Sequence, residues 1–248
     1  MISTDGMTEL YQQYRHDLVS VRRRQYWFHR RHDNPLVRRL RKLRLRRHML
    51  FPALDDIEAE VTYLLIRARR PKVVIEMSPN GGWSTSWILS ALRDNDNGGQ
   101  LWSYDLHDTC MKFVPRELAA GRWNFVQGDA HETTRSAPNF DYLFIDADHS
   151  RAFAEWFVST LFPRVPRGAV VSVHDVFHTA EPSEEGEVVI RWLEQHGVPY
   201  WTPSPLVSTE VTDRIEQERA LLGIDYVIQA RDRHNPMLFF ETRGTTDG

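Results

Sequence analysis

One stretch of the chain constrains its fold more than any other, an apolar run that ends abruptly in charged residues. The run covers residues 140–145 and is followed by Asp146-Ala-Asp148-His149. A short run of mostly apolar residues bounded by polar ones predicts a strand buried on both faces, as in a parallel sheet. In open α/β sheets the ligand lies just beyond the carboxyl ends of such strands. We therefore expect Asp146, Asp148 and His149 to face the functional site.

Three other apolar runs end in the same way. Their residues and polar ends are 72–75 with Glu76, 100–104 with Asp105, and 168–173 with His174 and Asp175. The segments of helical pattern between the runs are residues 84–93, 114–120 and 151–162. Strands that alternate with helices predict βαβ units in a parallel sheet, and right-handed crossovers bring the strand ends to one rim. The sequence therefore predicts an α/β fold with an acidic rim.

The N-terminal part of the chain differs from the rest in charge. Residues 15–48 hold 13 Lys/Arg and 2 Asp/Glu, although the whole chain has a net charge of −3. Such an excess can mark contact with nucleic acid or a membrane. Pro35 divides the region into two predicted helices, 8–32 and 35–48, with apolar residues at partly helical spacing. We favour an amphipathic arm that packs on a partner subunit, in a homo-oligomer, or on the acidic body.

Composition predicts one cytoplasmic domain. A chain of 248 residues with 41% hydrophobic content can bury one large core. No apolar stretch reaches the length of a membrane span, and the first residues lack the order of a signal peptide. The lone Cys110 forms no internal disulfide, which suits a reducing compartment. We expect a basic helical arm over residues 1–52, a domain over 53–243 that opens with a helix at 53–70, and a tail at 244–248.

A tight bend follows the first predicted strand. The turn at residues 80–82 contains two glycines, and Ser84 is a candidate N-cap of the next helix. A backbone that turns this tightly can cradle part of a nucleotide-like ligand. Asp105 could accept hydrogen bonds from both hydroxyls of a ribose, and Asp129, at the end of a third strand, from an adenine amine. The sequence therefore predicts a crevice for such a ligand.

Four ordered segments resemble the motifs of the class I S-adenosylmethionine-dependent methyltransferases, within a match over residues 72–175. They are residues 74–85, 101–105, 127–130 and 141–146. The family's first motif has the pattern acid-x-Gly-x-Gly-x-Gly. Here Glu76 is the acid, Ser78 and Asn80 replace the first two glycines, and Gly82 keeps the third. This departure concerns the loop that meets the methionine end of the cofactor.

The resemblance implies a Rossmann-like sheet of seven mostly parallel strands, with helices on both faces, the last strand antiparallel, and the N-terminal helices added. Residues 223–230 and 236–241 would be the sixth and seventh strands, and 184–196 the preceding helix. The connection at 197–222 would be either a lid over the acceptor or an irregular crossover. The cofactor would be S-adenosyl-L-methionine, with contacts from Glu76, Ser78, Asn80, Gly82, Ser84, Asp105, Leu106, Asp129, Ala130 and Asp146.

The acids and histidines after the fourth and fifth strands also resemble a known arrangement. Metal-assisted O-methyltransferases of natural-product biosynthesis, of the macrolide sugar and cephalosporin-tailoring types, have a similar pattern. The resemblance implies Asp146 and Asp175 as Mg²⁺ ligands and His149 as the general base, with Asp146 in the catalytic group. His174 is the remaining candidate ligand, although many relatives have an acid at its position. Alternatively, Asp146 recognises the cofactor's amino group and His149 caps the next helix.

These inferences predict an O-methyltransferase that acts on a hydroxyl of a small molecule, such as a phenol or sugar of secondary metabolism. Two alternatives remain. One is an RNA methyltransferase that uses the basic arm, and the other is a fold that binds the cofactor without methyl transfer. A dinucleotide-dependent oxidoreductase is disfavoured because the Gly-x-Gly-x-x-Gly fingerprint is absent. Acids at the third and fourth strand ends also suit a cationic sulfonium better than a pyrophosphate.

Overall fold

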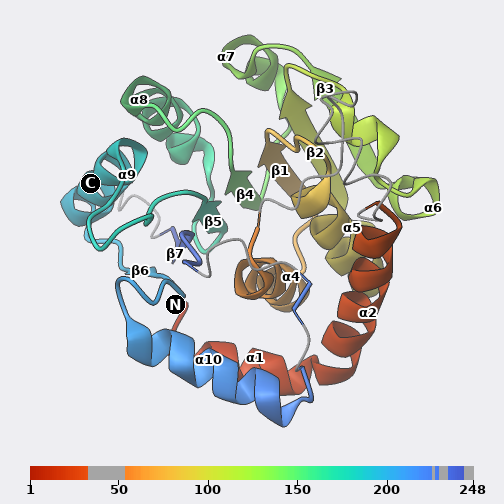
Figure 1. The fold of residues 1–248 in the computed structure, drawn as a ribbon. Helices are drawn as coiled ribbons and strands as arrows, with labels where there is room; N and C mark the ends of the chain where they lie inside the picture. The colour runs from red at the N-terminus through yellow and green to blue at the C-terminus, as the bar shows by residue number, and fades with distance from the viewer. Residues whose placement is uncertain (33–53, 225–226, 229–233, 243–248) are drawn as a thin grey trace, which may run out of the picture.

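The computed structural model of the chain describes residues 1–32, 54–224, 227–228 and 234–242. Within these residues seven strands form one sheet in the order β3-β2-β1-β4-β5-β7-β6 (Figure 1). The strands are β1 (Val73–Met77), β2 (Gln100–Asp105), β3 (Trp123–Gln127), β4 (Tyr142–Ile145), β5 (Val170–Val173), β6 (Tyr200–Trp201) and β7 (Leu238–Glu241). Strands β1 to β5 pair in parallel, whereas β7 runs antiparallel to both β5 and β6. The predicted fold class is confirmed.

Helices cover both faces of this sheet (Figure 1). They are α1 (Thr4–Gln13), α2 (Arg15–His32), α4 (Asp56–Arg69), α5 (Trp83–Asn95), α6 (Arg116–Ala119), α7 (Ala130–Thr133), α8 (Arg151–Thr160), α9 (Glu184–Gln195) and α10 (Thr209–Leu221). One hydrophobic core joins one face of the sheet to α1, α2, α4, α5 and α10. A second core joins the other face to α8 and α9. Among the described residues, no helix is both long and apolar enough to cross a membrane.

Strand β4 illustrates why the central strands are apolar throughout. Successive side chains of a strand point to opposite faces of the sheet. Tyr142 and Phe144 accordingly belong to the core on the α4 side, and Leu143 and Ile145 to the core on the α8 side. Because both faces are covered, every position of the strand is buried. The apolar run then stops where the chain leaves the sheet at Asp146.

Helix α4 buries acidic residues as well as apolar ones. The acids are Asp55 at its N-cap, Asp56, Glu58 and Glu60. Glu60 accepts a hydrogen bond from Tyr11 of α1 (2.8 Å) and forms ion pairs with Arg22 of α2 and Arg219 of α10 (Nε to Oε2, 3.0 Å). Arg22 is itself fully buried. A buried ion pair that loses one partner costs several kcal/mol, so the described N-terminal helices are anchored in the interior of the domain.

The predicted helices correspond closely to observed ones in the described residues. The prediction at 8–32 corresponds to two helices, α1 and α2, and that at 53–70 corresponds to α4. The second predicted helix of the basic arm, residues 35–48, and the tail at 244–248 lie outside the described residues.

The C-terminal part requires one correction. Residues 223–230 were predicted as the sixth strand, but their described members, 223–224 and 227–228, lie outside any strand. Strand β6 is instead Tyr200–Trp201, and the connection at 197–222 also contains helix α10. The segment 223–230 has the apolar composition of a strand because Ile224 and Ile228 pack in the core on the α4 side. A strand of two residues, by contrast, is too short to show alternation.

Candidate functional site

The loop after β1 adopts the conformation of a glycine-rich turn although only one of its three special positions is glycine. Ser78, Asn80 and Gly82 have φ angles of 60°, 46° and 84°. This left-handed region costs about 1–2 kcal/mol for most residues other than glycine. At Gly82 a Cβ atom would lie 2.5 Å from the Val114 side chain. The loop therefore keeps the backbone course of the predicted motif at the two positions where its glycines are replaced.

Glu76 and Ser84 lie beneath this loop, in the interior. Ser84 and Thr85 donate hydrogen bonds to Glu76 Oε1 (2.7 and 3.0 Å), and Ser103 donates to Oε2 (2.5 Å). Burial raises the pKa of Glu76 to about 7, and the three hydroxyl donors limit that rise. Helix α5 begins at Trp83 with Gly82 as its N-cap, so the predicted capping role of Ser84 is wrong. The hydrogen bond between Glu76 of β1 and Ser84 of α5 therefore joins the two elements that flank the loop.

A cavity of about 440 Å³ opens beside the ends of β1, β2 and β4. Its volume lies in the range of small-molecule sites. Five of the predicted cofactor residues line it, namely Ser78, Asp105, Leu106, Asp129 and Ala130. The other lining residues are Met77, Tyr104, His107, Gly128, His131, Ala147, Asp148 and Phe153. The predicted residues Glu76, Asn80, Gly82, Ser84 and Asp146 are not among the residues that line it.

Two carboxylates in this cavity are held by backbone donors. Asp105 Oδ2 accepts a hydrogen bond from the Asn80 N–H (3.0 Å), and Oδ1 accepts one from the His107 N–H (2.9 Å). Asp129 caps α7 by accepting from the His131 N–H (2.9 Å). The hydrogen bonds from the side chain and backbone of His131 lower the pKa of Asp129. Each carboxylate oxygen has two lone pairs, so both acids retain capacity to accept from a ligand.

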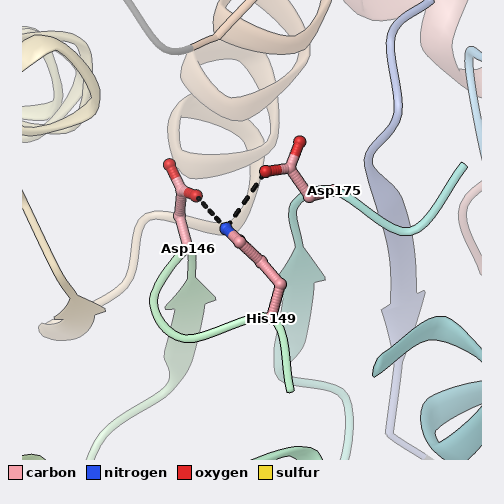
Figure 2. Close-up of side chains that lie close together, drawn as sticks. All are labelled: Asp146, His149 and Asp175. Carbon is pink, nitrogen blue, oxygen red and sulfur yellow. Dashed lines mark ion pairs between the residues drawn. The ribbon is translucent and has the colours of Figure 1, made fainter. Parts of the chain in front are cut away.

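The acids at the ends of β4 and β5, Asp146 and Asp175, lie beside His149 (Figure 2). We refer to Asp146, His149, His174 and Asp175 together as the rim. His149 Nε2 lies 3.1 Å from Asp175 Oδ2 and 3.8 Å from Asp146 Oδ1. One ligand atom from each of the three residues lies within 4.8 Å of the others. Asp175 also has a φ angle of 55°, and such strained residues are concentrated at functional sites. Two carboxylates and an imidazole at this spacing fit a divalent cation.

His149 does not cap the following helix. That role belongs to Ser150, whose side chain accepts from the Phe153 N–H (3.3 Å). The His149 ring instead places Nδ1 2.9 Å from Glu185 Oε2. Burial alone would lower the pKa of His149, but the hydrogen bond to Glu185 and the charges of the nearby acids raise it. The ring is 39% exposed, which leaves it accessible to a substrate.

His174 lies under the two acids and is almost fully buried. Its Nδ1 is 3.2 Å from Asp146 Oδ1 and 3.1 Å from Asp175 Oδ1, and its Nε2 is 3.3 Å from Glu58 Oε2. Burial opposes its charge, but the three carboxylates outweigh this and raise the pKa of His174 well above its usual value. The pKa of Asp175 falls to about 2, because contacts with His174 outweigh burial. Both ring nitrogens of His174 face carboxylates, so this geometry favours an ion-paired support under the acids.

Sequence reasoning missed two residues of this group, Glu58 and Glu185. Both are fully buried and each contacts a histidine of the rim. Glu58 belongs to α4, far from His174 in sequence, and Glu185 belongs to α9, 36 positions after His149. An acid in the first turn of a helix is ordinary because it complements the helix dipole. Neither position therefore carries a signal that distinguishes it from a solvent-exposed acid.

Comparisons with known proteins agree with this geometry. Residues 79–176 match the model of a methyltransferase domain family. This span runs from the loop after β1 to the residue after Asp175, so it includes the acids at the ends of β4 and β5 and all residues that line the cavity except Met77 and Ser78. No curated protein matches the sequence.

The solved structures that resemble this chain show the same fold at low sequence identity. The O-methyltransferase TomG from Streptomyces achromogenes, in complex with SAM and involved in tomaymycin synthesis, is 17% identical, with a TM-score of 0.54 over 83% of this chain and 86% of TomG. An O-methyltransferase from Bacillus cereus in complex with SAH is 14% identical, with a TM-score of 0.52 over 97% of this chain and 100% of its own. The family match over residues 79–176 and the order of the sheet agree with the predicted fold of the class I S-adenosylmethionine-dependent methyltransferases.

Proposed function

We propose that the protein transfers a methyl group from S-adenosylmethionine to a hydroxyl oxygen of a small molecule, such as a phenol or sugar of secondary metabolism. The observation that carries this proposal is the position of His149. Its Nε2 faces the acids at the ends of β4 and β5, and the same β4–α8 loop contributes Ala147 and Asp148 to the cavity. A proton acceptor therefore lies next to the space proposed for the cofactor.

The cavity supports the assignment of the cofactor. Asp105 would accept hydrogen bonds from the ribose hydroxyls, and Asp129 with Ala130 would meet the adenine amine. Ser78 and Leu106 would line the remaining cofactor surface. Glu76 and Ser84 would act indirectly, by holding the loop in place. The negative charge of the lining also suits a cationic sulfonium.

The proposed chemistry is an in-line displacement in which the protein positions the acceptor and removes its proton. His149 would accept the proton of the acceptor hydroxyl at Nε2, and Asp146 would help to fix the ring. Asp146 and Asp175 would hold Mg²⁺, a cation that binds a few carboxylates and keeps other oxygen ligands. Bound there, it would make a coordinated hydroxyl easier to deprotonate. His174 and Glu58 would keep the two acids in place from below.

The first test is a calorimetric titration of S-adenosylhomocysteine into the wild type and Asp105→Ala, with and without Mg²⁺. We expect the wild type to bind and Asp105→Ala to bind about tenfold to a hundredfold more weakly, the loss expected for a charge-assisted hydrogen bond. Asp108→Ala is the matched control, because Asp108 is a nearby exposed acid outside the lining. No binding by the wild type would favour a fold without cofactor. Methyl transfer that resists a chelator would remove Mg²⁺ from the mechanism.

The proposed homo-oligomer would use the exposed surface of the N-terminal helices. The side chain of Trp27 on α2 is large and 57% exposed. Removing the whole arm is a poor test, because Arg22 is a buried partner of Glu60. Light scattering of the full chain and of Trp27→Glu is the better test. An oligomer in the wild type that Trp27→Glu dissociates would support the proposal, and a monomeric wild type would overturn it.

A further inference from the structure

Glu185 is a buried carboxylate on helix α9 whose hydrogen bond in the described part of the chain goes to His149. The residue is 0% exposed, and its Oε2 lies 2.9 Å from His149 Nδ1. Its Oε1 has no hydrogen-bond partner among the described residues. Burying a charged group is costly unless it is paired. The contact with His149 is therefore the interaction that offsets this cost.

The backbone around Glu185 is fixed by close packing. A Cβ atom on the next residue, Gly186, would lie 2.8 Å from Val176 Cγ1 and 3.1 Å from the Val176 carbonyl oxygen. Val176 directly follows Asp175, so α9 begins tightly against the chain that carries one acid of the rim. Glu185 lies in the first turn of α9, where the helix dipole favours a carboxylate. The carboxylate is thus held in a defined place behind the His149 ring.

This placement selects one form of the imidazole. When Nδ1 carries a hydrogen and donates it to Glu185, the neutral ring has its lone pair on Nε2. Nε2 is the nitrogen that faces Asp175 at 3.1 Å and Asp146 at 3.8 Å. The opposite form would donate its Nε2–H to Asp175 and leave no acceptor there for a proton. It would also leave the buried Glu185 unpaired, which costs more than leaving Asp175 without this bond, because Asp175 is 22% exposed and also contacts His174. In other proteins, a carboxylate that accepts a hydrogen bond from one ring nitrogen of a functional histidine fixes the tautomer and the orientation in which the other nitrogen acts.

We propose that Glu185 is a positioning residue that holds His149 in the Nδ1–H form, with the Nε2 lone pair directed at the acidic rim. This role rests on the proposed function of His149 as the proton acceptor in methyl transfer. Glu187, two residues along the same helix, provides a contrast. It is half exposed and forms an ion pair with Arg151 on the outside of the protein. Of these two acids, Glu185 is therefore the one that contacts His149.

The test is nitrogen NMR of the histidine rings in protein labelled with ¹⁵N-histidine, in metal-free buffer and over a pH series that extends until His149 is neutral. The signals of His149 are assigned by their loss in His149→Asn. We expect the neutral wild-type ring to favour the Nδ1–H form by about tenfold or more, the ratio expected for one charge-assisted hydrogen bond. Glu185→Gln, which keeps the size of the side chain, should reduce this preference severalfold.

Glu187→Gln is the matched control and should leave the ring signals of His149 unchanged. A neutral wild-type ring that favours the Nε2–H form would overturn the proposal even if Glu185→Gln fails to fold. An unchanged preference in folded Glu185→Gln would overturn it as well. S-adenosylhomocysteine affinity is measured on the same samples and should change less than about twofold in Glu185→Gln, a difference of under half a kcal/mol. Failure of the wild type to bind it would count against the proposed function and leave the NMR result on Glu185 standing.

Discussion

The candidate cofactor cavity and the rim at the ends of β4 and β5 are built from different kinds of interaction. In the cavity, the exposed or half-exposed acids Asp105 and Asp129 accept hydrogen bonds from backbone N–H groups of nearby residues. At the rim, His174 and His149 contact the fully buried acids Glu58 and Glu185, which come from distant helices. The cavity therefore depends on local backbone geometry, and the rim depends on the assembled tertiary structure.

This difference predicts that the two regions respond differently to mutation. Changes in the cavity should alter cofactor affinity with little effect on stability, because its acids are exposed to water. Changes behind the rim should alter stability or catalysis, because they leave buried groups unpaired. Four variants test this contrast, from the largest expected effect to the smallest.

Glu58→Ala should be the most destabilising. It removes an ion-pair partner of His174 and the acceptor for the Met237 N–H (2.8 Å). Breaking a buried ion pair costs about 3–5 kcal/mol, and the free energy of unfolding in urea measures the loss. Glu187→Ala, at an exposed acid, should cost far less. Equal losses in the two variants would contradict a special role for the buried pair.

Glu76→Gln should remove a pH dependence of stability. The folded pKa of Glu76, about 7, lies above its ordinary value of 4.5, so the folded state keeps a proton that the unfolded state loses between these values. This contribution is complete below pH 4.5 and is lost as the pH rises through 7. The wild type should lose about 3 kcal/mol between pH 4.5 and 8 relative to the variant. The free energy of unfolding is measured in urea at both pH values. A difference between wild type and Glu76→Gln that is the same at pH 4.5 and pH 8 would refute this prediction.

His149→Ala should separate the two regions functionally. Loss of a general base typically slows turnover about a hundredfold or more, whereas the cavity residues stay in place. Single-turnover transfer of a labelled methyl group, with an acceptor found by screening, measures the first effect. Calorimetry with S-adenosylhomocysteine measures the second, which should be small. Equal losses of turnover and affinity would show that His149 belongs to the cofactor region.

Ser78→Gly should have the smallest effect and the opposite sign. Ser78 has a φ angle of 60°, which glycine adopts without strain. After the greater flexibility of unfolded glycine is subtracted, the variant should gain about 0.5 kcal/mol of stability. Ser20→Gly, at an exposed position within α2, is the control and should lose about 0.5 kcal/mol. A loss at Ser78 as large as that at Ser20 would show that the loop gains nothing from glycine.

Most of the sheet could be predicted from sequence because its signals are local. The runs that form β1, β4 and β5 are mostly apolar because both faces of these strands are covered, and polar residues follow where the chain leaves the sheet. Local patterns also predicted α4, α5, α6 and α8, and the family resemblance predicted α9, whereas the short helix α7 was not predicted. Prediction was wrong for β6, because two residues show no alternation and the apolar segment at 223–230, with Ile224 and Ile228 in the core, has the composition of a strand.

For the candidate site, the sequence by itself determined which acids and histidines stand at the strand ends, since parallel strands deliver their carboxyl ends to one rim. It did not determine their charge states or partners. Glu58 and Glu185 look in the sequence like ordinary helical acids, and only folding buries them against His174 and His149. Burial and Coulomb interactions depend on distances in space, so tertiary structure alone decided which groups support the rim.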